Sequence, residues 1–292
     1  MAKSAILKSS IAKKYWMALT GLFLCTFLIG HLLGNLQILY ADAHQFNSYA
    51  LFMTSNPAVK ALSYITYLSI LFHAIDGAIL AYQNAKARPV GYVKNNPSKN
   101  SMWSSRNMGV LGTLILVFIV THMMSFWAVM HFDSKMPLEK MSVQVNAQMP
   151  GQKKDFYITQ TPGQFIAAEQ VGESKEKAQA AGQPYYQRNK TEIVNTQYDI
   201  KMADGYKDLY KITVAFFKDP KYGLLYTILY GIAMVVLGLH LDHGFGSAFQ
   251  SMGLNHPKYS PMISKIGRGF AIIVPLLFAI IPFYVHFFMK TV

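Results

Sequence analysis

Five long apolar stretches alternate with polar segments along this chain, and each is long enough to cross a lipid bilayer. A transmembrane helix needs about 20 mainly apolar residues at about 1.5 Å rise each. Tyr and Trp favour the headgroup region and mark several ends of these stretches, among them Tyr15, Tyr40 and Trp127. The pattern therefore predicts an all-α membrane protein with five transmembrane helices, approximately over residues 15–40, 61–84, 108–132, 222–245 and 269–289.

Composition supports a chain that lies largely in hydrocarbon. Apolar residues make up 52% of the 292 residues, and charged residues only 14%, against roughly 25% in ordinary globular domains. These values exclude a typical soluble enzyme, a disordered tail and a fibrous repeat. The single cysteine, Cys25, excludes a disulfide framework, thiolate-bound iron–sulfur clusters and multi-cysteine zinc sites. We interpret Cys25 as a small buried apolar residue.

The basic residues are concentrated on one side of the predicted spans. The N-terminus, the loop between spans two and three and the loop between spans four and five carry basic residues and no Asp or Glu. Because cytoplasmic loops are enriched in Lys and Arg, the N-terminus is predicted to be cytoplasmic and the C-terminus outside. The net charge of +13 is thus explained by topology, without nucleic acid. The basic set is Lys3, Lys8, Lys13, Lys14, Lys86, Arg88, Lys94, Lys99, Arg106, Lys258, Lys265 and Arg268.

A long polar segment, residues 133–221, separates spans three and four and is expected outside the cytoplasm. A short exposed helix is expected around residues 172–182. Residues 206–217 place apolar side chains at helical spacing with charged residues between them, which predicts an amphipathic helix. That helix would lie on the outer membrane surface or pack on its own loop, and the sequence favours neither.

Four of the nine histidines lie inside spans, one in each of the first four: His31, His73, His122 and His240. A single intramembrane histidine is usually hydrogen-bonded to a neighbouring helix, but one in each of four consecutive spans indicates a functional site. His31 and His122 each lie about 15 residues, or ~22 Å, into outward-running spans. His73 and His240 lie nearer the inner ends of inward-running spans. The sequence therefore predicts two histidine pairs in two layers.

The cofactor that fits a pair of imidazoles is haem b, because the porphyrin supplies the other four iron ligands. Zinc and copper sites generally need three or four protein ligands. A small residue follows each histidine by three or four positions, on the same helix face: Gly34, Gly77, Ser125 and Gly244. Glycine is also common in transmembrane helices for other reasons. We nevertheless expect these four residues to pack against two haems in a bundle formed by the first four helices.

Four sequence motifs carry a family resemblance: GHLLGN around His31, FHAIDG around His73, VTHMMSFW around His122 and LHLDHGFGSAFQ around His240. The chain resembles the five-helix, di-haem cytochrome b subunit of succinate:menaquinone oxidoreductases and the related fumarate reductases. The resemblance covers all five spans in order. It implies that His31 and His122 ligate an outer haem and that His73 and His240 ligate an inner one, with His243 as a neighbour.

The resemblance also implies an anchor without succinate chemistry of its own, in the bacterial cytoplasmic membrane. A flavoprotein with FAD and an iron–sulfur subunit would dock on the cytoplasmic face, and electrons would pass through the inner and outer haems to menaquinone. The long outer loop departs from the family core. Some members carry a glutamate two residues before the fourth ligand, where this chain has Gly238, so a proton route through that glutamate is not expected.

Gln37, Asp42 and His44 lie beyond His31 toward the outer surface and are candidate hydrogen-bond partners for a quinone ring. Asp76 and Asp242 are interpreted as polar residues that contact a neighbouring helix or the membrane interface.

Three alternative functions stay open, one of which is a purely structural anchor without redox work and without haem. A di-haem cytochrome b anchor of a hydrogenase or formate dehydrogenase would use the same ligands with a different soluble partner. A transporter with intramembrane histidines would contain no haem, although the sequence shows no internal repeat or paired broken helices.

Overall fold

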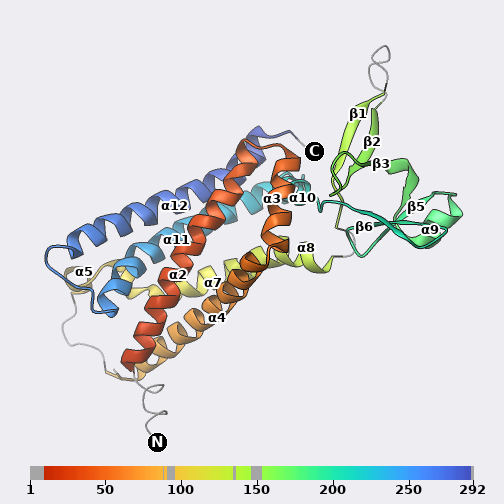
Figure 1. Ribbon diagram of the computed structural model, residues 1–292. Coiled ribbons are helices and arrows are strands. Elements are labelled where there is room, and N and C mark those ends of the chain that lie inside the picture. Colours follow the sequence, from red (N-terminus) through yellow and green to blue (C-terminus); the bar gives the residue numbers. More distant parts are fainter. Residues whose placement is uncertain (1–9, 88, 91–95, 134–135, 146–152, 291–292) are drawn as a thin grey trace, which may run out of the picture. The chain divides into compact units, whose positions relative to one another are not determined.

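The computed structural model describes residues 10–87, 89–90, 96–133, 136–145 and 153–290. Five of its helices are long and apolar enough to cross a membrane (Figure 1), so the prediction of five candidate spans is confirmed. Lys3, Lys8, Arg88 and Lys94 of the basic set lie outside the described residues. The five helices cover Ile11–Leu39, Pro57–Lys86, Met108–Phe132, Gly223–Ser251 and Ser260–Phe288.

The first helix consists of α2 (Ser10–Leu36) and a short 3-10 turn, η1 (Gln37–Leu39), and the second is α4 (Pro57–Lys86). The third consists of α7 (Met108–His122), a π-helical turn (Met123–Ala128) and α8 (Val129–Phe132). The fourth and fifth are α11 (Gly223–Ser251) and α12 (Ser260–Phe288). Two one-turn helices, α5 (Pro97–Asn100) and α6 (Trp103–Arg106), precede α7.

Helices α4 and α12 begin before their apolar stretches, α4 at a capping asparagine and both with a proline in the first turn. The Asn56 side chain accepts hydrogen bonds from the amides of Ala58 and Val59, at 2.9 and 3.3 Å, and Pro57 occupies the first turn. Proline also stands in the first turn of α12, which begins at Ser260 rather than at residue 269. The polar first turns of α12 suit a helix that extends beyond the hydrocarbon layer.

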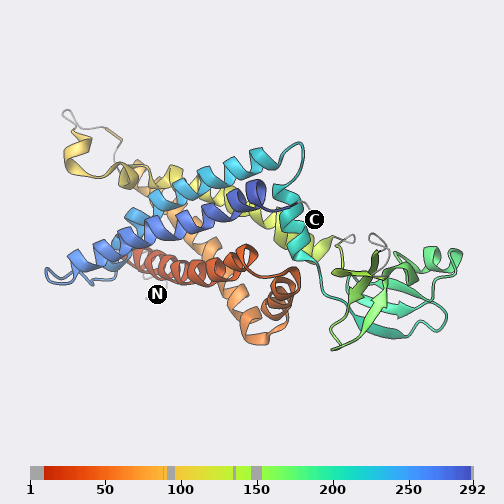
Figure 2. The same cartoon turned by 90° about the horizontal axis from the view of Figure 1, so that it is seen from above.

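The chain divides into two compact units. The first contains Met1–Tyr40, Asn56–Thr121 and Phe216–Thr291, and the second contains Ala41–Ser55 and His122–Ala215. Within the first unit, α11 packs along α12, and α2 packs against α4, α11 and α12 (Figure 2). Cys25, Leu241 and Ala271 form a buried cluster there, which confirms that Cys25 is a buried residue.

Large apolar side chains on the long helices point away from the protein. Leu33, Val110 and Ile272, for example, are 62%, 61% and 59% exposed. Monomeric soluble proteins rarely expose extended apolar surfaces, whereas lipid tails solvate them. The five apolar helices and their exposed side chains are those of a multi-pass membrane protein.

Gly238 allows α11 to approach α12 closely. A Cβ atom at this position would lie 2.9 Å from the carbonyl oxygen of Ala271. Since backbone cannot move aside easily, we expect Gly238→Ala to destabilise the protein by roughly 1–3 kcal/mol through overpacking. A glutamate at this position, as considered in the sequence analysis, would meet the same backbone oxygen unless α12 moved.

Thermal unfolding of the full chain in detergent measures this effect. Gly246→Ala, on the same helix, is the matched control because a Cβ there has nothing within 4 Å. It should be neutral or slightly stabilising, since alanine has the higher helix propensity. Equal melting temperatures for Gly238→Ala and Gly246→Ala would show that close packing at Gly238 is unimportant.

The second unit contains two small β-sheets, so the prediction of an all-α protein is wrong for this part of the chain. One sheet has the antiparallel order β1-β2-β3. The other has the order β4-β5-β6-β7, in which only β4 and β5 pair in parallel. The strands are β1 (Lys140–Gln144), β2 (Lys153–Ile158), β3 (Phe165–Ala167), β4 (Val171–Gly172), β5 (Tyr185–Arg188), β6 (Glu192–Asn195) and β7 (Lys201–Asp204).

Both sheets contribute to one hydrophobic core. Its buried members come from β2, β3, β4, β6 and β7 and from the segment before β1: Leu138, Tyr157, Ile166, Val171, Ile193 and Ala203. Residues before β1 pair with residues after β7, through an isolated bridge between Leu138 and Lys207. The long polar segment is therefore folded, and the residues that lead into its sheets pair with the residues that lead out of them.

The two helices expected in this segment are present as α9 (Lys175–Ala180) and α10 (Leu209–Phe217). Val214 of α10 is only 1% exposed, so part of its apolar face packs against protein. Two further elements of the unit were not predicted: η3 (Ala168–Gln170) and α3 (Ala43–Ser55). Asp42 starts α3, because its side chain accepts the Gln45 amide at 2.7 Å.

Candidate functional site

His73 of α4 and His240 of α11 bring their imidazole rings together inside the first unit. The ring centroids are 6.2 Å apart, and the ring planes are inclined by 71°. Both helices pack against α2, while the described residues of α4 and α11 make few close backbone approaches to each other. The two side chains therefore meet although the backbones of their helices stay apart.

Thr20 of α2 fixes the hydrogen-bonding state of His73. The buried Thr20 hydroxyl donates to the carbonyl oxygen of Trp16 at 2.9 Å or of Met17 at 3.1 Å. The same oxygen lies 3.3 Å from His73 Nδ1. Because the hydroxyl proton is already used, Thr20 acts as the acceptor and Nδ1 carries the ring proton. The Nε2 atom of His73 then keeps its lone pair for a ligand bond.

His240 has an unusual buried nitrogen. Its Nδ1 atom is buried and has no hydrogen-bond partner among the described residues. Buried polar atoms are nearly always paired, so such an atom requires an explanation. His243, which follows on the same helix, is half-buried. Of the two histidines, the ring of His240 is the one that meets His73.

Glycines on two neighbouring helices line the two rings. A Cβ atom at Gly21 of α2 would lie 3.1 Å from His73 Cε1, and one at Gly112 of α7 would lie 3.7 Å from His240 Cε1. The site is thus built by α2, α4, α7 and α11. Sequence analysis missed Thr20, Gly21 and Gly112, because they lie on different helices from the histidines they contact and no spacing along one helix relates them.

The four small residues predicted from the sequence lie in different surroundings. Gly77 has open space where a side chain would be, and the nearest atom to a Cβ at Gly244 is Met108 Cε, at 4.0 Å. Gly34 is buried, and Ser125 lies in the π-helical turn after α7. Gly77 therefore leaves room beside His73, and the packing role of all four residues remains a prediction.

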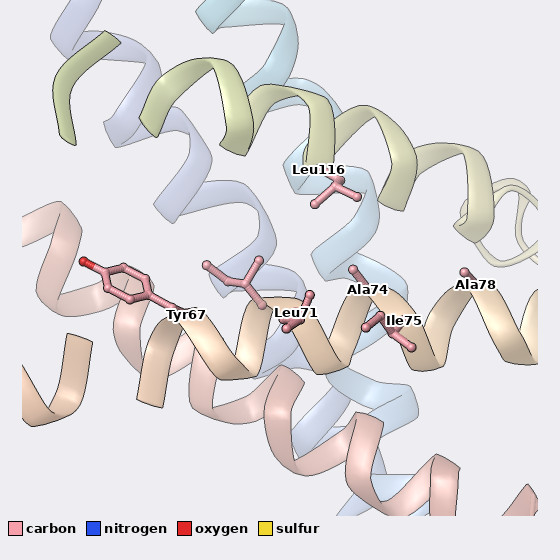
Figure 3. A pocket seen from close by; sticks show the side chains of 7 residues that line it. Tyr67, Leu71, Ala74, Ile75, Ala78 and Leu116 are labelled. Atoms are coloured by element: carbon pink, nitrogen blue, oxygen red, sulfur yellow. The ribbon is translucent and has the colours of Figure 1, made fainter. Parts of the chain in front are cut away.

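An apolar groove of about 560 Å³ lies between α4 and α7, and His73 is not among the residues that line it. Figure 3 shows Leu116 of α7 opposite Leu71 and Ala74 of α4. Ala74 directly follows His73 in the chain. Six of the seven lining side chains are aliphatic: Ile70, Leu71, Ala74, Ile75, Ala78 and Leu116, with Tyr67 as the seventh. The groove is suited to a hydrophobic group.

His31 lies among aromatic side chains of the first unit. Its ring stacks on Phe27, with centroids 5.3 Å apart, and is tilted against Phe278 of α12 at 5.7 Å. The amide nitrogen of Asn35 lies 3.3 Å from His31 Nδ1 and donates to the His31 carbonyl oxygen at 2.7 Å. Because an amide N–H can only donate, Nδ1 is the acceptor in this contact, and which nitrogen would bind a metal stays a prediction.

His122 is the last residue of α7 and directly precedes the π-helical turn Met123–Ala128. Such turns are rare and often occur at functional sites. The ring of Phe126, within the turn, lies 5.4 Å from the ring of His122. His31 belongs to the first unit and His122 to the second, so their pairing remains a prediction.

The three candidate quinone residues are also divided between the two units. Gln37 lies in η1 of the first unit, whereas Asp42 and His44 belong to the second. Asp42 caps α3. The ring of His44 lies 5.0 Å from that of Tyr206, and both line a groove of about 440 Å³ with residues of the β1-β2-β3 sheet and its loops. Quinone binding by any of the three remains a prediction.

His44 also contacts a buried carboxyl group. Its Nδ1 lies 3.3 Å from Glu139, whose side chain is only 3% exposed. Burial raises the pKa of Glu139 above its ordinary value of 4.5, and hydrogen bonds from Asn47 and His44 oppose this shift. The nearby carboxylate of Asp208 raises the pKa further. The folded state therefore holds a proton on Glu139 at pH values where the unfolded chain has lost it.

The sign of this shift predicts how pH affects the second unit. The stabilisation that Glu139 contributes is complete below its unfolded pKa and is lost as pH rises through the raised folded pKa. The side chain of Glu139→Gln stays neutral at every pH. The melting temperature of this variant relative to that of the unmodified chain should therefore increase as the pH rises from about 4.5 to about 7. Thermal unfolding in detergent, followed at both pH values, measures the gain. Glu173→Gln, an exposed control, should show none; a pH-independent difference for Glu139→Gln would contradict the prediction.

Two acidic residues lie within the long helices, and the described basic residues of the two predicted cytoplasmic loops are exposed. Asp242 of α11 forms an ion pair with Arg268 of α12, with Oδ1 and Nε 3.6 Å apart. Asp76 is partly buried in α4. The described basic residues Lys86, Lys99, Arg106, Lys258 and Lys265 are all exposed, so they are accessible to water or to a partner.

Comparisons with protein-family models, with curated proteins and with solved structures found no match. The arrangement of the His73 and His240 rings, with Thr20 and the two glycines around them, is therefore the main guide to the chemistry of this chain.

Proposed function

We propose that this protein is a membrane-anchor cytochrome b with two bis-histidine haems b, in a complex of the succinate dehydrogenase and fumarate reductase type. In this proposal it carries electrons between an iron–sulfur subunit and menaquinone. His73 and His240 hold the inner haem, and His31 and His122 hold the outer one. The proposal agrees with the family resemblance of the four histidine motifs.

The observation that carries the proposal is the distance of 6.2 Å between the ring centroids of His73 and His240. Metal–imidazole bonds are about 2 Å long, and each ring nitrogen lies about 1 Å from its own centroid. Two imidazoles bound to opposite sides of one iron therefore have centroids about 6 Å apart. The gap suits a shared metal atom, whereas a direct hydrogen bond between the rings would bring them closer.

The surrounding residues also fit a haem. When bound, haem supplies a one-electron redox centre whose potential depends on its ligands and their hydrogen bonds. Thr20 holds the proton of His73 on Nδ1 and so orients Nε2 as the ligating atom, the usual arrangement around a metal-bound histidine. Gly21 and Gly112 leave room for the two rings.

The proposed topology follows from the basic residues. The N-terminus and the loops before α7 and α12 face the cytoplasm, and the C-terminus and the β-sheet unit lie outside. The flavoprotein with FAD and the iron–sulfur subunit dock on the basic cytoplasmic face. The proposed location is the bacterial cytoplasmic membrane. The candidate residues for quinone binding are Gln37, Asp42 and His44.

The soluble partner distinguishes this proposal from other di-haem anchors. The complex, solubilised in mild detergent and purified through this chain, should contain a covalent flavin and an iron–sulfur protein. Gel fluorescence of the flavin and metal analysis of the same preparation measure both. Recovery of a nickel or molybdenum enzyme instead would overturn the proposed partners and favour a hydrogenase or formate dehydrogenase anchor.

A further inference from the structure

Two lysines of the second unit hold the end of the third long helix. Lys190 Nζ donates a hydrogen bond to the carbonyl oxygen of His131, and Lys207 Nζ donates to that of Met130, both at 2.6 Å. The last carbonyls of a helix have no partner within the helix and carry partial negative charge. Two ammonium groups at this point therefore both satisfy and electrostatically stabilise the end of α8.

The β-sheet unit presents both lysines from ordered backbone. Lys190 stands in the turn between β5 and β6, where Asn189 and Lys190 have φ angles of 50° and 67°, as a tight hairpin turn requires. Lys207 pairs with Leu138 at the base of the unit. The adjacent Asp208 accepts hydrogen bonds from Asn47 at 3.1 Å and from the Lys211 amide at 2.9 Å. The position of each ammonium group is thus fixed by its surroundings.

A series of contacts leads from these lysines to His122. The ring of His131 stacks on Trp127, with centroids 4.6 Å apart and planes 27° apart. His131 Nδ1 also lies 2.8 Å from the carbonyl oxygen of Trp127. Trp127 and its neighbour Phe126 belong to the π-helical turn, and the Phe126 ring lies 5.4 Å from that of His122. The lysines, the turn and His122 are therefore physically connected within one unit.

The turn needs support because its geometry is less favourable than that of an α-helix. π-helical turns are rare and occur mostly as single turns inside α-helices. If the turn reverted to α-helix, residues on its two sides would rotate relative to each other by about 100°, the angle per residue of an α-helix. Fixing the carbonyls of Met130 and His131 opposes this rotation.

We propose that Lys190 and Lys207 are positioning residues for His122: they hold the end of α8 and thereby fix the π-helical turn that orients the His122 ring. This inference rests on the proposed function, because it takes His122 as a haem ligand. In this proposal the β-sheet unit sets the orientation of one haem ligand, His122. The unit is an addition to the five helices that the sequence resemblance covers.

The test uses the full chain with Lys190→Met and Lys207→Met combined, since methionine keeps the length of the side chain and removes its charge. We expect hydrogen exchange of amides 123–132 to become at least about tenfold faster, because two charge-assisted hydrogen bonds are lost. In the electron paramagnetic resonance spectrum, one of two low-spin haem signals should shift while the other stays unchanged. Lys190→Arg with Lys207→Arg should restore both properties. If the double methionine variant does not accumulate, the same two measurements are made on Lys207→Met alone.

Lys154→Met with Lys177→Met is the matched control, because these lysines form exposed ion pairs in the same unit. It should change neither exchange nor spectrum. Unchanged exchange and spectrum in the Lys190 and Lys207 variant would overturn the inference, as would equal shifts of both haem signals, which would indicate general destabilisation. Absence of haem from the unmodified chain would refute the proposed function instead, so the two failures are distinguishable.

Discussion

Replacing His73 or His240 by alanine is expected to remove one of two haems, so that the ratio of haem to chain falls from two to one. In the proposed site each replacement would remove one of the two side chains that hold the haem, and the remaining histidine alone would not retain it. Both variants should therefore lose the same spectral component. Haem extraction and reduced-minus-oxidised absorption of the purified chain measure the loss.

His243→Ala is the control for these two variants, because His243 lies on the same helix and its ring does not take the place of His240 opposite His73. It should keep both haems. Loss of a haem from His243→Ala, with His240→Ala harmless, would mean that the other histidine of the HLDH sequence is the ligand. If His73→Ala and His240→Ala lost different components, these two histidines would not share one haem.

The second large effect concerns the outer pair. His31→Ala and His122→Ala should each remove one haem, and both should remove the same component, which differs from the one lost with His73. The reason is the proposed two-layer arrangement, in which His31 and His122 share the outer layer, because one haem cannot bind ligands in two layers. Redox titration of the remaining haem distinguishes the components, because two haems in different surroundings titrate at different potentials.

The pairing has a specific contrary result. If His31→Ala and His73→Ala abolished the same component and left the other intact, the two-layer arrangement would be wrong. Retention of both haems in His122→Ala would remove His122 from the ligand set. The variants at His73 and His240 would still test the inner site, since the residues around it all belong to the first unit.

The five spans could be predicted from the sequence because the length of an apolar stretch is a local property. The rings of His73 and His240, which the sequence assigns to one layer, lie with their centroids 6.2 Å apart, while their depth in the membrane and their role as ligands stay predictions. Helix ends were less predictable. The Asn56 cap and the proline in the first turn of α12 extend those helices into polar sequence, beyond what the apolar pattern indicates.

The environment of the histidines could not be predicted in the same way. Thr20, Gly21 and Gly112 contact His73 or His240 from other helices, and the rotation of one helix against another follows from packing. The β-sheets were missed because their strands, such as Phe165–Ala167, are too short for an alternating pattern to stand out. Lys190 and Lys207 resemble ordinary loop lysines until the fold brings them to the end of α8.

The measurement that tests the central claim most directly is the haem content of the purified chain. The pyridine haemochrome spectrum identifies the type of haem, and amino-acid analysis of the same sample gives the amount of protein. We predict b-type haem at two per chain, with His73 and His240 ligating one and His31 and His122 the other. A chain that folds in the membrane and contains no haem, or only one, would contradict this account.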